Sequence, residues 1–454
     1  MRTDEILDVI RAKLFYGSAD YTKSQPDLFI PHKFQLVAPS QVGRFLEDVR
    51  RNLVEEEILI YVHLPFCFSE CLFCNSFPHR TNKELQQEYL QGLLREIDLS
   101  AETGIFAGKR AKCVSLGGGT PTAFSNDSLR RILEKIQARI PLSENCCVTC
   151  EAHPATLSSR GRIRELADIG INRISIGCQT FDQELLRRCN RFHTEAQIRT
   201  VVDTARETGV ATNIDMMTGL PGQTLESVRK DLEFLVDVRP DAIEYIRHEI
   251  VNPLVIALYR NHPDLVVADD TLFEMVYLTQ DWMKQHGYEQ NGRFRSPDQW
   301  EYRYHWLREM PIIAFGARTR SYTKTICFDK HEDLSPYLLS IRKGIPPIGR
   351  YISLTKKEQM YRSLLLNLQV GAGLDTKQFQ RRFQEDPRDV FAPLIASLRE
   401  YGCLHVDDDS IHLSHYGSYF VEDVCDFVVD AALMEDSNSL VRAPHSTGRT
   451  SKRL

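Results

Sequence analysis

Three cysteines lie close together in the chain with a spacing that suits a metal centre: Cys67, Cys71 and Cys74 form Cys-x3-Cys-x2-Cys. A tetrahedral structural zinc site uses four protein ligands, so three thiolates supply one too few. A 4Fe-4S cluster has four irons, and three thiolates leave one iron without a protein ligand. Such an iron can chelate the amino and carboxylate groups of S-adenosylmethionine (SAM). The spacing therefore predicts a cluster that reduces SAM and cleaves one of its carbon-sulfur bonds.

The other nine of the 12 cysteines are scattered along the chain: Cys113, Cys146, Cys147, Cys150, Cys178, Cys189, Cys327, Cys403 and Cys425. Most of them occur in apolar contexts, where a cysteine acts as a small hydrophobic residue. Cys147 and Cys150 have the spacing of a redox or zinc pair, but they lie in an alternating strand pattern and no second pair follows. We therefore expect these nine side chains to be core residues.

The composition is that of a globular chain with a mildly acidic balance. Its 454 residues are 42% hydrophobic and 26% charged, and the formal net charge is -6. At about 150 residues per domain, this length predicts two to four units. No apolar run reaches the roughly 18 residues of a membrane span, and Met1–Lys13 lacks the apolar segment of a signal peptide. We expect a cytoplasmic protein with no membrane and no nucleic-acid partner, since nucleic-acid binders carry a basic face.

The secondary-structure pattern alternates short β-branched runs with longer amphipathic segments. Strands are predicted at Ile58–Leu64, Lys112–Leu116, Cys147–Ala152, Arg173–Cys178, Thr212–Met217 and Ala242–Arg247. Helices are predicted at Lys83–Thr103, Asn126–Arg139, Ser159–Ile169, Glu195–Glu207 and Leu225–Asp237. Strands separated by helices indicate parallel βα units, so the fold class is α/β, a partial (β/α)6 barrel of the TIM-like kind.

The pattern also divides the chain into five parts. We expect an N-terminal arm at 1–55, the barrel at 56–255, an irregular accessory segment covering the barrel at 256–350, a C-terminal unit at 351–434 and a disordered tail at 435–454. Helices followed by a hairpin make the C-terminal unit α+β and winged-helix-like. Its acidic sequence favours a lid or scaffold over a DNA-binding role.

Residues that can do chemistry fall where the predicted strands end. Parallel barrels place their active sites on the loops at the carboxyl ends of the strands. The three cysteines follow the first strand, Gly117–Thr122 follows the second, and Glu151 ends the third. Gln179 follows the fourth strand, and Asp215 lies late in the fifth. One mouth of the barrel should therefore collect them all.

Several segments together resemble a known family. They are Tyr61-Val-His-Leu-Pro-Phe-Cys67, Gly117-Gly-Gly-Thr-Pro-Thr122, Glu151-Ala-His-Pro154, Ile174-Ser-Ile-Gly-Cys-Gln-Thr-Phe181, Asn190-Arg191 and Asp215-Met-Met-Thr-Gly-Leu-Pro-Gly-Gln-Thr224. They are similar to the radical SAM enzymes of the oxygen-independent coproporphyrinogen III dehydrogenase (HemN-like) family. That family includes haem chaperones, haem-degrading enzymes and class C radical SAM methyltransferases. The resemblance is close over roughly residues 55 to 255 and looser through the C-terminal unit.

The resemblance implies a role for each matching residue. A 4Fe-4S cluster on the three cysteines would have the aromatics Tyr61 and Phe73 beside it. The first SAM would contact Gly117, Gly118, Gly119, Thr120 and Glu151, since glycine lets a ligand approach the backbone closely. A second SAM would contact Gln179, Arg191 and Asp215, because arginine can pair bidentately with a carboxylate. The alternative for these last three is a structural polar network under the barrel mouth.

A charged triplet stands where the family has blander residues. Arg247, His248 and Glu249 close the last predicted strand, so we interpret them as specificity or acid-base groups at the mouth. Glu249 and His248, with Tyr61, are the catalytic candidates. Arg318, Arg320 or the pair Arg293 and Arg295 could meet a substrate carboxylate; the alternative is solvated surface arginine.

The function that this pattern favours is a class C reaction with two SAM molecules. Such an enzyme transfers a methyl or methylene group to an sp2 carbon of an aromatic, porphyrinoid or natural-product substrate, with electrons from a donor such as flavodoxin or ferredoxin. The alternatives are oxidative decarboxylation of a porphyrinogen and haem transfer or degradation. Ser76 replaces a cysteine of the dehydrogenases, and Glu301–Trp306 lacks the first two residues of the chaperones' haem motif.

The cluster prediction can be tested by counting iron. Anaerobically reconstituted protein should hold about four irons per chain, as three thiolates can retain one 4Fe-4S cluster. The triple variant Cys67→Ala, Cys71→Ala, Cys74→Ala should lose this iron and its visible absorbance, whereas Cys425→Ala in the C-terminal unit should keep both. An iron-free wild type would contradict the prediction.

Overall fold

The computed structural model describes residues 33–74, 79–157, 159–250, 252–288, 305 and 308–438. Several predicted features lie outside these ranges: most of the N-terminal arm, Ser76, Arg293, Arg295, most of Glu301–Trp306, and the tail from residue 439 on. Within the described part of the chain, no helix has both the length and the apolar composition needed to cross a bilayer.

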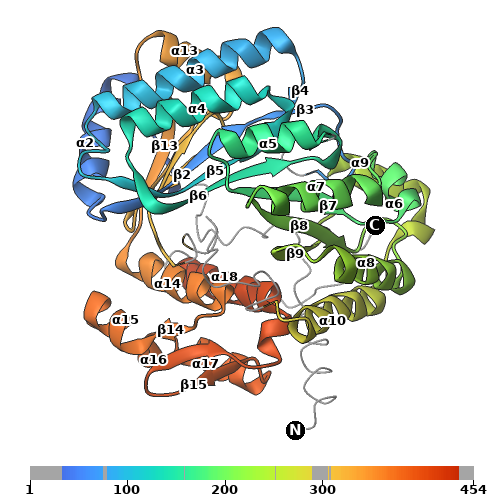
Figure 1. Cartoon of the computed structure of the whole chain (residues 1–454). Helices are drawn as coiled ribbons and strands as arrows, with labels where there is room; N and C mark the ends of the chain where they lie inside the picture. The colour runs from blue at the N-terminus through green and yellow to red at the C-terminus, as the bar shows by residue number, and fades with distance from the viewer. Residues whose placement is uncertain are drawn as a thin grey trace.

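Six parallel strands form one side of the main sheet, with the last of them at its edge. They are β2 (Glu57–Leu64), β5 (Arg110–Gly118), β6 (Leu142–Ala152), β7 (Arg173–Gln179), β8 (Ala211–Thr218) and β9 (Ala242–Arg247), adjacent in that order. The helices between them are α3 (Lys83–Glu102), α4 (Asn126–Arg139), α5 (Arg160–Asp168), α6 (Gln183–Arg188), α7 (Glu195–Glu207) and α8 (Leu225–Val238). Figure 1 shows α3, α4 and α5 on one side of this sheet. The predicted partial barrel of six βα units is confirmed, and the sheet remains open.

Local sequence explains why these elements begin and face as they do. Side-chain oxygens of Asn82 and Ser125 accept hydrogen bonds from the first turns of α3 and α4, which is the usual N-cap interaction. Along β2 the side chains alternate: Ile58 and Ile60 pack in the core that also holds the helices, and Tyr61 belongs to the cluster on the barrel interior. Hydrophobic alternation therefore decides which side chains face the mouth.

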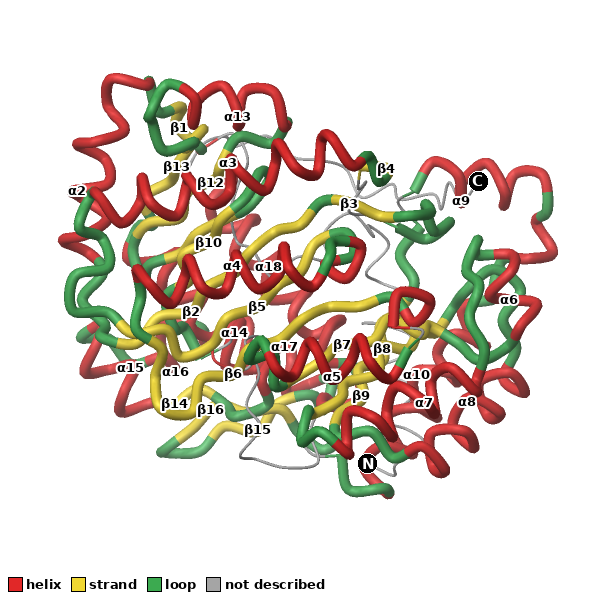
Figure 2. Tube along the Cα trace, turned by 45° about the horizontal axis from the view of Figure 1, so that its top comes forward, coloured by secondary structure: helices red, strands yellow, loops and turns green. Residues whose placement is uncertain are grey.

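The accessory segment adds ordered elements where the sequence predicted an irregular stretch. It contains α9 (Pro253–Asn261), α10 (Asp269–Gln285), β10 (Ile312–Phe315), β11 (Arg320–Tyr322), β12 (Ile326–Lys330), α13 (Leu334–Arg342) and β13 (Ile348–Ser353). β10 pairs in parallel with β2, and the next strands continue antiparallel to β1 (Gln35–Leu36) at the sheet edge. Figure 2 shows these strands as a continuation of the barrel strands. Runs of three to six residues are too short for a periodic pattern to identify.

The C-terminal unit is small and mixed, as predicted. Its elements are α14 (Lys356–Val370), β14 (Leu374–Asp375), α15 (Thr376–Phe383), α16 (Pro387–Val390), α17 (Ala392–Glu400), β15 (Leu404–Val406), β16 (Ser410–Leu413) and α18 (Val421–Asn438). Leu272 and Phe273 of α10 belong to the same hydrophobic cluster as the residues of this unit. Phe273 stacks on Phe420 with ring centroids 4.9 Å apart. Figure 1 shows the unit on the side of the sheet away from α3.

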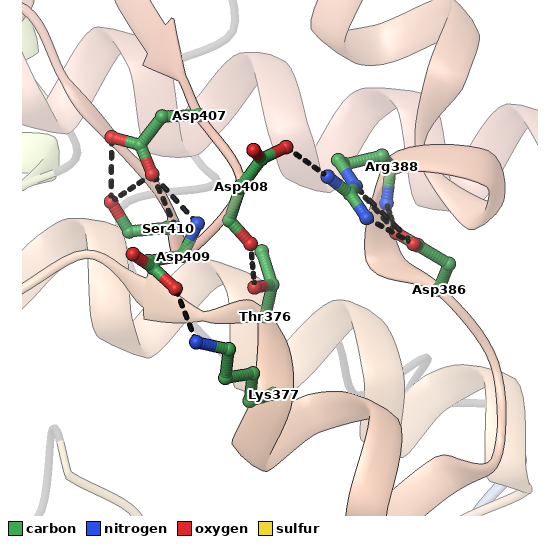
Figure 3. Close-up of polar contacts among 8 residues, drawn as sticks. All are labelled: Thr376, Lys377, Asp386, Arg388, Asp407, Asp408, Asp409 and Ser410. Atoms are coloured by element: carbon green, nitrogen blue, oxygen red, sulfur yellow. Dashed lines mark hydrogen bonds and ion pairs between the residues drawn. The ribbon is translucent and has the colours of Figure 1, made fainter.

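The acidic turn of its hairpin is explained by local contacts (Figure 3). A carboxylate oxygen of Asp407 accepts a hydrogen bond of 2.9 Å from the backbone amide of Asp409, which closes the turn. Asp408 pairs with Arg388 at 3.1 Å, and Asp409 pairs with Lys377 at 2.6 Å. The turn is therefore tied to the neighbouring helices through its charges.

A buried carboxylate connects the accessory strands to the barrel. Glu96 of α3 is fully buried, and its oxygens accept hydrogen bonds from the Gly316 amide at 2.8 Å and the Tyr337 hydroxyl at 2.6 Å. It also pairs with Lys330 at 2.9 Å. The Glu96 side chain thus joins α3 to the loop after β10, to α13 and to β12.

We expect Glu96→Gln to lower the free energy of unfolding by roughly 3–5 kcal/mol, because the buried Lys330 charge loses its partner. Urea unfolding would measure this change. The matched control is Glu102→Gln on the same helix, since Glu102 pairs with Arg95 at the exposed surface. Its effect should stay below about 1 kcal/mol. Equal effects of the two substitutions would contradict the expectation.

Candidate functional site

A cavity of about 640 Å³ lies at the carboxyl ends of the barrel strands. Its lining includes Cys67, Cys71, Phe73, Cys74, Gly119, Thr120, Glu151, Gln179, Arg191 and Asp215. Arg191 lies in the loop after α6, and the others come from β2, β5, β6, β7 and β8 or the loops that follow them, which meet at one edge because the strands are parallel. The volume is within the range of about 300–1,000 Å³ of small-molecule sites.

The cysteine loop is fixed at both of its ends. The Cys67 sulfur is 3.2 Å from the Thr120 hydroxyl, and the Cys74 amide donates to the carbonyl of Cys71 at 3.1 Å. The side-chain amide of Asn252 donates to the Cys74 carbonyl at 2.7 Å. Burial raises the pKa of the Cys67 thiol to about 11, so a metal that binds there must displace a proton.

Arg191 joins the cysteine loop to the far wall of the cavity. Its guanidinium donates to the sulfur of Cys71 at 3.1 Å and to the carbonyl of Gly177, and it lies 5.9 Å from the centre of the Phe73 ring. The neighbouring Asn190 donates to the backbone carbonyl of Glu70 at 2.7 Å. A residue predicted to hold a second SAM thus also contacts a predicted cluster ligand.

The glycine run is packed directly against the cysteine loop. Gly118 has φ +116°, and a Cβ there would lie 2.7 Å from a ring nitrogen of His63 and 3.0 Å from the backbone nitrogen of Leu64. A Cβ on Gly119 would lie 2.8 Å from the backbone of Phe66. The Gly118 amide donates to the carboxylate of Glu151 at 3.2 Å. Only glycine allows this approach.

Tyr61 lies next to the cavity and contacts His63 and Gly117. Its hydroxyl hydrogen-bonds the ring of His63 at 3.2 Å, and a Cβ on Gly117 would lie 2.9 Å from its ring. Burial lowers the pKa of His63 to about 4, so this ring is neutral at pH 7. Tyr61, Gly117 and Gly118 are adjacent to the cavity residues and are outside the lining itself.

On the side of the cavity formed by β7, β8 and the loop after α6, some buried polar atoms have no hydrogen-bond partner in the part of the chain that the structure describes. Gln179 has φ +74°, which is uncommon outside glycine. The buried atoms Gln179 Oε1 and Arg191 Nε have no hydrogen-bond partner among the described residues. Asp215 accepts a hydrogen bond from the hydroxyl of Ser175 at 3.2 Å. Since buried polar groups are normally paired, these atoms suit a polar ligand such as SAM.

The charged triplet at the end of β9 is not brought into the cavity lining. His248 is buried, its Nδ1 donates to the carbonyl of Gly219 at 3.1 Å, and burial lowers its pKa to about 4. Arg247 forms an ion pair of 2.9 Å with Asp423 of α18. Glu249 is half-buried and also outside the lining. Arg318 and Arg320 line a second cavity with Arg350, beside β11 to β13.

Sequence reasoning missed several lining residues: His153, Arg162, Ser175 and Phe192. His153 accepts a hydrogen bond from the amide of Ala155 at 3.1 Å, and burial, with the nearby Arg191, lowers its pKa to about 3. Ser175 could have been found from the sequence. It lies two residues before Gly177 and four before Gln179, and residues at these spacings share one face of a strand.

Comparison with known proteins gives two domain matches and a set of relatives. Residues 61–235 match the radical SAM superfamily model, and residues 354–420 match the HemN C-terminal domain. The heme chaperone HemW of Bacillus subtilis is 27% identical over 80% of this chain and 97% of its own. The HemW of Haemophilus influenzae is 31% identical, over 51% of this chain and 60% of its own.

Oxidase relatives cover the chain to a similar extent. The oxygen-independent coproporphyrinogen III oxidase of Escherichia coli is 26% identical over 84% of this chain and 87% of its own. The solved structure of the Escherichia coli coproporphyrinogen III oxidase HemN superposes with a TM-score of 0.75, covering 85% of this chain and 93% of that one at 24% identity. That superposition shows a shared fold.

We expect Gly118→Ala to weaken SAM binding at least tenfold, because the added Cβ is strained at this φ and displaces the glycine run from the cysteine loop. Calorimetric titration of reconstituted protein would measure the dissociation constant. Gly161→Ala in α5 is the control, since a Cβ there has nothing within 4 Å. If both variants bind SAM like the wild type, the glycine run is not a SAM contact.

Proposed function

We propose that this chain is a radical SAM enzyme of the HemN-like type, which cleaves SAM and oxidises a small molecule at the barrel mouth; the matches of residues 61–235 and 354–420 support this. The substrate class that we propose is a porphyrinogen-like carboxylate, which loses a hydrogen atom to the radical and then CO2, with one electron passing to a one-electron acceptor. The oxidase relative that spans most of both chains supports this choice.

One observation carries the proposal: a single cavity is lined by the three cysteines, by Gly119 at the end of the glycine run and by polar residues from the ends of successive strands. Cys67, Cys71 and Cys74 would hold a 4Fe-4S cluster, and Gly119 and Glu151 would contact SAM. When bound, the reduced cluster supplies one electron to SAM, which yields methionine and a 5′-deoxyadenosyl radical. The electron would come from a donor such as flavodoxin or ferredoxin.

The chain's own residues prepare this site in two ways. The guanidinium of Arg191 donates a hydrogen bond of 3.1 Å to the Cys71 sulfur, which holds this proposed iron ligand in position. Glu151 accepts the amide of Gly118 and so keeps its carboxylate at the cavity wall, where it can accept from a cationic amino group. Both side chains act by position and charge.

Methyl transfer from a second SAM is the second candidate, favoured by a specific observation. Gln179, Arg191 and Asp215 line the same cavity as the cysteines, and the first two retain buried polar atoms without a partner among the described residues. A second SAM bound there would have its methyl group inside the cavity that the radical enters. Tyr61, His248 and Glu249 stay candidates for the catalytic acid or base, with Tyr61 nearest to the cavity lining.

Haem transfer is a third outcome that has less support from the geometry. His305, the histidine of the segment nearest to the chaperones' haem motif, interacts electrostatically with Glu57 and Lys112 at the start of β2 and β5. Burial lowers its pKa to about 4. The cysteines lie at the other end of β2, so His305 and the proposed cluster occupy opposite ends of the barrel.

Mass spectrometry can distinguish these three functions. Reduced enzyme is incubated with methyl-labelled SAM and a porphyrinogen, and the products are identified. We expect 5′-deoxyadenosine and CO2 without S-adenosylhomocysteine, because hydrogen abstraction leaves the SAM methyl group unused. Labelled product together with S-adenosylhomocysteine would instead establish methyl transfer. One haem bound per chain with no 5′-deoxyadenosine would establish haem transfer.

Binding of a second SAM can be tested with two isosteric substitutions, one in the cavity and one at the surface as its control. Asp215→Asn removes a carboxylate from the cavity wall, and Asp237→Asn removes one that is exposed and pairs with Arg199. Under decarboxylation with a single SAM, neither changes the ratio of SAM consumed to CO2. A ratio that changes only in Asp215→Asn indicates a second SAM.

A further inference from the structure

Two cysteines outside the cluster loop lie side by side on the barrel interior. Cys113 of β5 and Cys147 of β6 are register partners in adjacent parallel strands, and their thiols are hydrogen-bonded to each other. Adjacent strands are about 4.8 Å apart. A disulfide needs Cα atoms about 4.4–6.8 Å apart, so the backbone is already at a bonding separation.

The surroundings of the two thiols differ. Cys113 is 1% exposed within a cluster that includes Leu59 and Ile312, while Cys147 is half-buried at its border, with its sulfur 3.4 Å from the hydroxyl of Thr149. A small oxidant therefore reaches Cys147 first. The structure holds both as thiols.

The electrostatics agree with this order. The hydrogen bond to Cys147, together with burial, raises the pKa of Cys113, which therefore keeps its proton. The thiolate is the nucleophile of cysteine oxidation, and Cys147 is the more accessible of the two sulfurs. Cys147 is thus suited to attack and Cys113 to resolve.

We propose that Cys113 and Cys147 form a redox-modification site that is separate from the cluster cysteines and that a hydroperoxide converts to a disulfide. The Cys147 thiolate attacks the O–O bond and becomes a sulfenic acid, releasing water or an alcohol. The Cys113 sulfur then displaces the sulfenic oxygen as water, forming the S–S bond. In total, two thiols and one hydroperoxide give one disulfide, one water and one alcohol or second water.

The position of this site links it to the cavity. Cys113 precedes Gly117 by four residues, and Cys147 precedes Glu151 by four, or roughly 13 Å along each strand at 3.3 Å per residue. The disulfide would therefore tie β5 to β6 below the cavity without using a cluster ligand. The residues that it would brace are the two neighbours Gly117 and Glu151.

The test is peptide mapping of the full-length protein after hydrogen peroxide and thiol blocking. We expect a reducible species that joins the tryptic peptides 113–130 and 140–160 and lacks two hydrogens relative to their sum. Fragmentation of that species should assign the bond to Cys147 rather than Cys146 or Cys150, which needs no variant. Alkylation of Cys113 and Cys147 in the oxidised protein should be lost and return after reduction.

Two variants of the same strand sharpen the assignment. Cys147→Ser should abolish the linked species, and Cys146→Ser should keep it, because Cys146 packs in the core on the opposite face of β6. Unchanged thermal unfolding of both would show that they fold. A wild type that gives no linked species, or a species that survives Cys147→Ser, would overturn the proposal whatever reaction the cluster performs.

Discussion

The close approach of two backbone segments is the constraint on which the site depends. Hydrogen bonds from the Gly119 amide to Leu64 and from the Thr120 amide to Phe66, at 3.0 and 2.9 Å, extend the pairing of β2 and β5 beyond both strands. Side chains at the glycines would prevent it. The cysteine loop therefore has one position relative to the glycine run, and the β7 and β8 residues close the cavity around that position.

A large part of this arrangement could be predicted from the sequence. The barrel strands are β-branched runs of six to eleven residues separated by amphipathic helices, so their parallel connection and the place of Glu151 and Asp215 toward the strand ends follow from the pattern. The accessory strands could not be predicted, since β10 and β11 are short and owe their existence to pairing with the sheet.

Partnerships between distant residues were also beyond sequence reasoning. Arg191 matched a SAM contact by motif, but its hydrogen bond to the Cys71 sulfur depends on how the loop that follows α6 lies against the cysteine loop, where the Leu72 amide donates to the Cys189 carbonyl. The sequence placed Arg247 at the barrel mouth, but in the structure it forms an ion pair with Asp423 of α18, which lies 176 residues further along the chain. Cys147 was predicted to be a core residue because it lies in an alternating strand pattern. That pattern does not show that Cys147 is the register partner of Cys113 on the neighbouring strand.

The ion pair between Arg247 and Asp423 has a mechanical consequence. The pair joins the end of β9 to the start of α18, and the two side chains are only 11% and 2% exposed. Salt screens exposed charges far more than buried ones. The C-terminal unit is therefore held to the rim of the barrel by a contact that rising ionic strength weakens far less than it weakens a surface ion pair.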